Sequence, residues 1–180
     1  VVAVPIFFNI YSSRIFEPDK VVLLRSLALI ILTAWIIKII EEGGINWERL
    51  TKGATKWETL KNTPMLFPVI ALMVVYGLAT IFSVTPRVSL WGSYQRLQGA
   101  YTTLSYVVVF AAIAVNLRRR EQIDHLLTAI ILASLPVSLY GVLQRYRIDP
   151  VPWGGDVSVR ITANMGNSIF IAAYLVMTFF

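Results

Sequence analysis

The sequence predicts an all-α protein, a polytopic transmembrane helix bundle with four complete and two partial spans. Hydrophobic residues make up 57% of the 180 residues and charged residues only 14%, whereas about a quarter of a soluble domain is charged. Several apolar runs reach the roughly 20 residues that a helix needs to cross about 30 Å of hydrocarbon. A water-soluble domain of this size cannot bury so much apolar surface.

The apolar runs define the spans in order along the chain. Four complete spans lie between two partial ones at the ends of the sequence. The complete spans are residues 21–40, 65–82, 101–117 and 126–143; the partial ones are residues 1–8 and a last run that begins near Ile161 or Ser168. Because both terminal runs are apolar and short, we expect residues 1–180 to form a single transmembrane domain that belongs to a longer protein.

Three connecting segments are long enough to carry structure of their own. Residues 41–64 are polar, and residues 47–60 place apolar side chains at spacings of three and four. This pattern favours a short amphipathic helix on the membrane surface, and a solvated loop is the alternative. The cluster Arg118-Arg119-Arg120 at the end of a span marks the cytoplasmic side. Residues 41–64 are therefore expected in the cytoplasm, and residues 83–100 and 144–160 on the outer side.

The outer side then keeps an excess of basic residues where the positive-inside tendency predicts depletion. Arginine presents a planar fork that matches carboxylate or phosphate oxygens. An anionic ligand such as a lipid-linked diphosphate explains the excess, and lipid headgroup binding is the alternative. Nucleic acid is not expected as a partner, because the basic residues lie in short loops between apolar runs. The basic residues of the outer side are Arg14, Lys20, Arg87, Arg96, Arg145, Arg147 and Arg160.

The outer loop 83–100 combines aromatic residues with hydrogen-bond donors. Arg96 and Gln98 supply guanidinium and amide groups, and Gly92 and Gly99 permit a close backbone approach or a positive φ. Such a set suits a sugar or a pyrophosphate. The alternative is an interfacial or re-entrant helix with no ligand.

A second group of polar residues stands at the mouth of the last apolar run. Arg160, Asn164 and Asn167 are costly against lipid, so we expect them to face protein or an aqueous cavity. They are candidate binding residues, and helix capping with interhelical hydrogen bonds is the alternative.

No metal or cofactor is expected. The chain has no cysteine, and its single histidine, His125, stands without further ligand-type residues at a cytoplasmic helix start. We interpret His125 as an interfacial polar residue. The sequence contains no nucleophile constellation and no phosphate-binding glycine loop.

Two stretches resemble the O-antigen ligase and polymerase superfamily of bacterial membrane glycosyltransferases. In the first, Trp91-Gly92-Ser93-Tyr94 is followed by Arg96 and by Gln98-Gly99 ahead of a membrane helix. The second is RITANMGNSIFIAAYL, residues 160–175, in which Ala163 replaces the usual glycine and Ser168 the usual proline. The segment Phe16-Glu17-Pro18-Asp19-Lys20 before an apolar run is also similar to large members.

The resemblance implies a multi-pass protein of the bacterial inner membrane that transfers a glycan from an undecaprenyl diphosphate carrier to an acceptor, without a metal. This chain would be its amino-terminal part, and the essential histidine would lie beyond Phe180. The expected partners are membrane lipid and the lipid-linked glycan. Arg96 and Arg160 would contact the diphosphate, and the substrate-binding residues would be Arg96, Gln98, Arg160, Asn164 and Asn167. Two alternatives are a noncatalytic transmembrane subunit of a larger bioenergetic or photosynthetic complex and part of a transporter.

Overall fold

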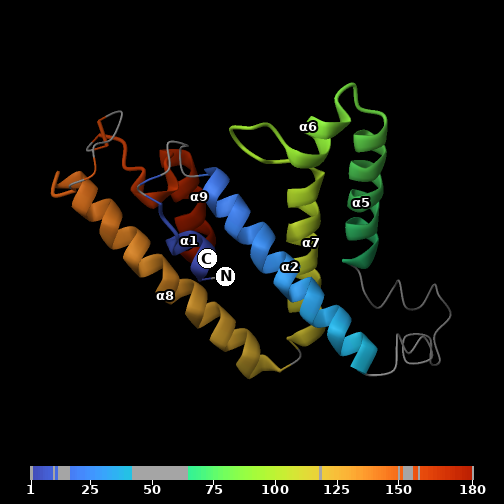
Figure 1. The fold of residues 1–180 in the computed structure, drawn as a ribbon. Coiled ribbons are helices and arrows are strands. Elements are labelled where there is room, and N and C mark those ends of the chain that lie inside the picture. The colour runs from blue at the N-terminus through green and yellow to red at the C-terminus, as the bar shows by residue number, and fades with distance from the viewer. Residues whose placement is uncertain are drawn as a thin grey trace. The chain divides into compact units, whose positions relative to one another are not determined.

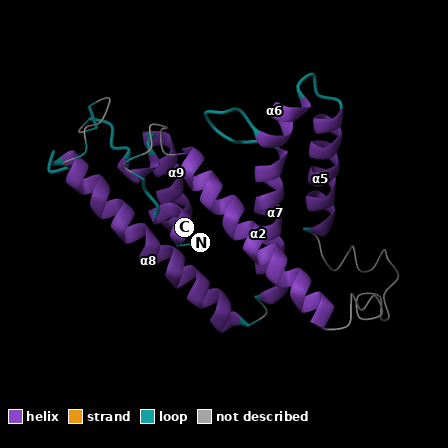
Figure 2. Ribbon diagram, viewed as in Figure 1, coloured by secondary structure: helices purple, strands orange, loops and turns teal. Residues whose placement is uncertain are grey.

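The part of the protein that the structure describes is entirely helical and loop. The computed structural model describes residues 2–9, 11, 17–41, 65–117, 119–149, 151, 156, 157 and 159–179, and it contains no strand in those ranges (Figures 1 and 2). The predicted all-α class is therefore confirmed.

The helices follow the apolar runs of the sequence. In chain order they are α1 (Ala3–Ile6), α2 (Glu17–Glu41), α5 (Leu66–Ile81), α6 (Pro86–Trp91), α7 (Ala100–Asn116), α8 (Arg120–Arg145), the 3₁₀ helix η1 (Ala163–Met165) and α9 (Ser168–Phe179). Local signals set several starts. Pro86 opens α6 at a position where a missing N–H costs nothing. The Gln122 side chain accepts a hydrogen bond from the Arg119 N–H at the start of α8 (3.1 Å).

Two helices, α2 and α8, are long and apolar enough to cross a membrane. They contain 25 and 26 residues, which corresponds to about 37 and 39 Å. Only 11% of the most apolar stretch of α2 and 17% of that of α8 is buried. The core helix of a soluble protein would bury most of such a stretch, so these two helices indicate a membrane protein.

Of the four expected complete spans, the two at 21–40 and 126–143 form helices that are long and apolar enough to cross a membrane, α2 and α8. The runs at 65–82 and 101–117 form α5 and α7, apolar helices of 16 and 17 residues, which are about 24 and 26 Å long and so shorter than the hydrocarbon layer. The expected partial spans form α1, with four residues, and α9, with 12. The proposed surface helix at 47–60 and Arg118 of the basic cluster lie outside the described residues.

The chain divides into two compact units, and α2 runs through the boundary between them. The terminal unit comprises residues 1–24 and 114–180, and the middle unit comprises residues 25–113. In the terminal unit, α8 packs against α1, η1 and α9, around a small core of Val137, Ala163 and Ile171. Gly141 lets the chain approach α8 closely, since a Cβ there would lie 3.1 Å from the Ile161 side chain.

The middle unit contains the α5–α6 hairpin, the loop 92–99, α7 as far as Ile113 and the greater part of α2. The predicted outer loop 83–100 is thus partly helical, because α6 occupies its first half. The predicted outer loop 144–160 begins two residues later than expected, because α8 continues to Arg145.

Candidate functional site

The loop 92–99 of the middle unit is closed by two glycines at its neck. Gly92 has a φ of +86°, and a Cβ at this position would overlap the backbone of Leu97 and Gln98. A Cβ at the buried Gly99 would overlap the backbone of Leu90 and Gly92. Both glycines allow the expected close backbone approach, and Gly92 also has the positive φ. The two ends of the loop are therefore held backbone to backbone.

Arg25 of α2 binds both sides of this neck. Its Nη2 donates hydrogen bonds to the carbonyl oxygens of Trp91 at 2.8 Å and Leu97 at 2.5 Å. Its Nε and Nη2 donate to Thr102 Oγ1 at 3.0 and 2.7 Å. The Thr102 hydroxyl in turn donates to the Leu97 carbonyl at 2.6 Å. One guanidinium thus joins the end of α6, the loop and the first turn of α7.

The burial of Arg25 differs from what its place in an apolar run suggests. A long side chain near the start of a membrane helix is expected to reach the headgroups, but Arg25 is only 7% exposed. Its guanidinium lies 4.7 Å from the centre of the Tyr101 ring, in the geometry of a cation–π contact. Among the described residues it has no ion pair, so carbonyls, a hydroxyl and an aromatic ring compensate its charge.

The segment of the sequence that contains the loop carries basic residues and no acidic ones. No acidic residue occurs between Glu58 and Glu121, whereas Arg87 and Arg96 lie in this stretch. Along α2, the acidic residue nearest to Arg25 is Asp19, about 9 Å away along the helix axis. The segment that carries the loop is therefore basic, and this favours an anionic ligand.

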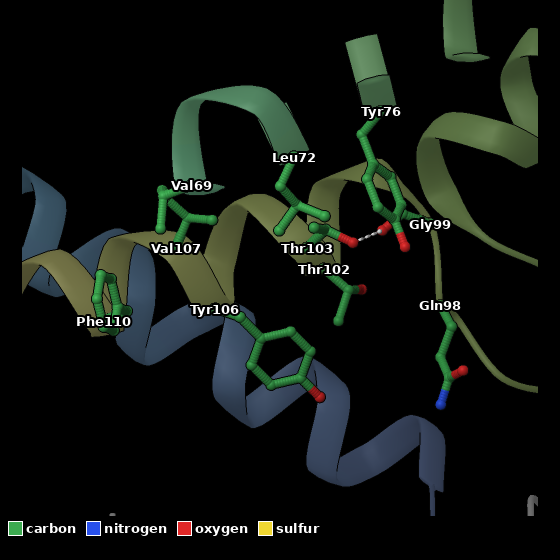
Figure 3. Close-up of a pocket in the computed structure, with 10 residues that line it drawn as sticks. All are labelled: Val69, Leu72, Tyr76, Gln98, Gly99, Thr102, Thr103, Tyr106, Val107 and Phe110. Carbon is green, nitrogen blue, oxygen red and sulfur yellow. Dashed lines mark hydrogen bonds between the residues drawn. The ribbon is translucent and has the colours of Figure 1, made fainter. Parts of the chain in front are cut away.

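A groove of about 510 Å³ runs beside the loop between α5 and α7. Figure 3 shows Gln98 and Phe110 at its two ends, with Tyr76 of α5 among the lining residues between them. The α7 residues that line the groove recur at spacings of three and four and so share one face of the helix, and α5 contributes one residue per turn. The lining residues are Val69, Leu72, Tyr76, Gln98, Gly99, Thr102, Thr103, Tyr106, Val107 and Phe110.

The groove changes from polar to apolar along its length. The side chains nearest the loop are Gln98, Thr103 and Tyr106, whereas Val107 and Phe110 follow further along α7. On the antiparallel α5, Tyr76 lies nearer the loop than Val69 does, because α5 ends where the α6 hairpin begins. From Gly99 to Phe110 the stripe extends about 16 Å. This gradient matches an amphipathic molecule whose polar group lies at the loop.

Of the predicted site residues, Arg96 and Gln98 belong to the loop of the middle unit. Both side chains are exposed. The N–H groups of Arg96 and Leu97 donate to the Ser93 carbonyl, at 3.2 and 2.8 Å, so Arg96 lies in a tight turn. Gln98 follows this turn and lines the groove. The structure thus brings these two predicted residues together.

The other three predicted residues lie in the terminal unit. Here Gln144 of α8, which is fully buried, fixes the backbone that precedes α9. Its Oε1 accepts hydrogen bonds from the N–H groups of Ala163 (2.7 Å) and Thr162 (3.3 Å), and its Nε2 donates to the Ala163 carbonyl (3.3 Å). Ala163, where the resembling motif has glycine, has a φ of +44°. The turn therefore adopts the left-handed conformation that glycine favours.

Asn164 and Asn167 make structural contacts. The buried Asn164 donates through Nδ2 to the carbonyls of Pro5 (2.6 Å) and Ile6 (3.3 Å), while its Oδ1 has no partner. Asn167 Oδ1 accepts from the Ile169 N–H at 2.9 Å and caps α9. These contacts match the alternative of capping and interhelical hydrogen bonds, and they leave the binding role of both residues a prediction.

Arg160 stands at an exposed position before this turn. Its backbone N–H donates to the Asp156 carbonyl at 3.4 Å. The exposed guanidinium remains available for a ligand, so its predicted contact with a diphosphate stays a prediction.

The described residues contain no group of three or more potential ligands that could hold a metal ion. His125 is exposed in the second turn of α8, as expected of an interfacial polar residue.

The sequence analysis missed the roles of Arg25 and Gln144. A charged residue within an apolar run is itself a signal of function in a membrane protein, and this signal could have identified Arg25. Gln144 carries no such signal, since a glutamine near a helix end is common at a membrane surface. Comparisons of the chain with protein-family models, curated proteins and solved structures find no match.

Proposed function

We propose that this chain is part of a bacterial inner-membrane glycosyltransferase that binds a glycan carried on undecaprenyl diphosphate. The observation that carries the proposal is the groove between α5 and α7, which is polar at the loop 92–99 and apolar further along α7. An isoprenoid chain with an anionic headgroup has the same division of polarity.

The headgroup would lie at the loop. Arg96 is exposed there, and Gln98 lines the adjacent end of the groove. The stretch between Glu58 and Glu121 contains no acidic residue, so no carboxylate of this segment would repel a diphosphate. The guanidinium of Arg96 can bind two phosphate oxygens at once, which the ammonium of a lysine cannot do in the same geometry.

The isoprenoid would lie along the apolar stripe. Val107 and Phe110 of α7 face Val69 and Leu72 of α5 across the groove (Figure 3). The large apolar side chains on the outside of α5, such as Phe67 and Val75, are exposed and suit contact with bulk lipid. The motif resemblance at residues 91–99 supports the same assignment, because it implies that Arg96 contacts the diphosphate.

Binding of undecaprenyl diphosphate and of uncharged undecaprenol to the chain in lipid nanodiscs tests the proposal. We expect Arg96→Met to weaken diphosphate binding at least tenfold and to leave undecaprenol binding unchanged, since only the phosphate contact is lost. Val107→Trp should weaken both, because the indole fills the groove. Val109→Trp, on the same helix and not lining the groove, is the matched control and should weaken neither.

Equal binding of the two lipids by the wild-type chain would contradict the headgroup site. Absence of binding would contradict the proposal as a whole and would favour the alternative, a noncatalytic transmembrane subunit of a larger membrane complex.

A further inference from the structure

We propose that Arg25 is the positioning residue of the loop 92–99, which it holds in one conformation from the adjacent helix α2. The assignment starts from the hydrogen bonds of its guanidinium to the carbonyls of Trp91 and Leu97. These two residues flank the turn that carries Arg96. A single side chain from a distant part of the sequence therefore fixes both sides of the loop.

The loop contains one residue in an unfavourable backbone conformation. Leu97 has a φ of +53°, a conformation that is unfavourable for a residue other than glycine. The Leu97 carbonyl accepts hydrogen bonds from both Arg25 and Thr102. These two bonds hold the peptide after Leu97 in place, and they offset the cost of the left-handed conformation.

The geometry requires arginine and not merely a cation. Nε and Nη2 act together on three acceptors, the Trp91 and Leu97 carbonyls and Thr102 Oγ1. The guanidinium carbon lies over the Tyr101 ring, 4.7 Å from its centre, and this ring also packs edge-on against Trp91 at 5.4 Å between ring centres. A lysine ammonium is a point charge without a planar fork, so it cannot reproduce this set.

Burial of this charge without an acidic partner costs free energy. A structural role alone could be filled by an apolar side chain of similar size. We therefore attribute the buried arginine to the loop 92–99, whose backbone it holds in the conformation that carries Arg96 and Gln98. The part of this inference that concerns ligand affinity rests on the proposed function, whereas the part that concerns loop conformation does not.

Amide hydrogen exchange of the ligand-free full chain in nanodiscs tests the conformational part. The Leu97 N–H bonds the Ser93 carbonyl at 2.8 Å and reports whether the turn is closed. In Arg25→Met and Arg25→Lys we expect this amide to exchange at least tenfold faster, while amides in the middle of α7 keep their wild-type rates. Arg87→Met, an exposed arginine of α6, is the matched control and should change neither.

Thr102→Val is a milder variant that retains the Arg25 bonds to both carbonyls. It should accelerate exchange at Leu97 by a smaller factor than Arg25→Lys does. Wild-type protection of Leu97 in Arg25→Met would overturn the assignment. Equal acceleration throughout α7 would also overturn it, because Arg25 would then support the whole unit rather than the loop.

The ligand part is tested with the same variants and the two lipids. We expect Arg25→Lys to weaken binding of undecaprenyl diphosphate at least tenfold and to leave undecaprenol binding unchanged, a split that general unfolding would not produce. Unchanged diphosphate affinity with an opened loop would overturn the ligand part. If the wild-type chain binds neither lipid, the proposed function fails, while the exchange result still decides whether Arg25 positions the loop.

Discussion

Replacement of Gln144 by methionine should destabilise the terminal unit strongly, although the two side chains are of similar size. Gln144 is fully buried, and its amide bonds the N–H groups of Thr162 and Ala163 and the Ala163 carbonyl. In Gln144→Met these three backbone groups lose their partner, whereas the apolar packing of α8 is kept. The loss is therefore one of hydrogen bonding.

The size of the effect follows from the number and burial of these groups. A hydrogen bond between membrane helices contributes on average about 0.6 kcal/mol, and a buried backbone group left unpaired costs about 1–3 kcal/mol. We expect the free energy of unfolding to fall by about 2–4 kcal/mol. Leu143→Met, at an exposed neighbouring position, is the control and should change it by less than about 0.5 kcal/mol.

The assay is unfolding of the chain by sodium dodecyl sulfate in mixed micelles, followed by far-ultraviolet circular dichroism. Exchange of the Ala163 amide, measured on the same samples, should accelerate in Gln144→Met and not in Leu143→Met. A loss of stability below about 0.5 kcal/mol with an unchanged Ala163 amide would refute the reasoning, because Gln144 would then not hold the turn before α9.

Three further predictions concern backbone conformation and capping, and unfolding under the same conditions measures them all. Gly99→Ala should lower the free energy of unfolding by more than about 2 kcal/mol, because the new Cβ overlaps backbone atoms. Gly77→Ala, whose Cβ would have nothing within 4 Å, should raise it by up to about 1 kcal/mol, and equal effects of the two substitutions would contradict this prediction. Ala163→Gly should leave the free energy of unfolding nearly unchanged, because relief of the positive φ offsets the loss of the methyl group. The control Ala133→Gly in α8 should lower it by about 1 kcal/mol, and a similar loss in both variants would show that the left-handed turn carries no strain. Asn167→Ala should lower the free energy of unfolding by about 1 kcal/mol, because the cap of α9 is lost. Asn167→Asp should keep the wild-type stability, since a carboxylate also caps a helix N-terminus, and an alanine variant of wild-type stability would exclude the capping role.

The fold class was predictable because hydropathy determines which segments avoid water. The runs at 21–40 and 126–143 form the long helices α2 and α8. The runs at 65–82 and 101–117 also match α5 and α7 to within one residue at each end. Neither helix is long enough alone to be assigned as a complete span, because hydropathy identifies an apolar helix without deciding whether it crosses the whole hydrocarbon layer.

The candidate site was predictable only in part, for a physical reason. Arg96 and Gln98 belong to a local pattern of glycines and donors, and local patterns are visible in a sequence. Arg25 lies 66 residues or more from the groups that it binds, and no periodicity reveals such a pairing. The same holds for Gln144, whose partners follow 18 and 19 residues later.

The central claim is that the groove between α5 and α7 holds the isoprenoid of a lipid diphosphate whose headgroup lies at the loop 92–99. Photo-crosslinking with an undecaprenyl diphosphate analogue that carries a diazirine on its isoprenoid chain, followed by mass spectrometry of the labelled peptides, tests it most directly. We expect labelling at Val107 and Phe110 that an excess of unlabelled undecaprenyl diphosphate abolishes and that Val107→Trp prevents. Labelling spread over the exposed apolar faces of α2 and α8, unaffected by competitor, would contradict it.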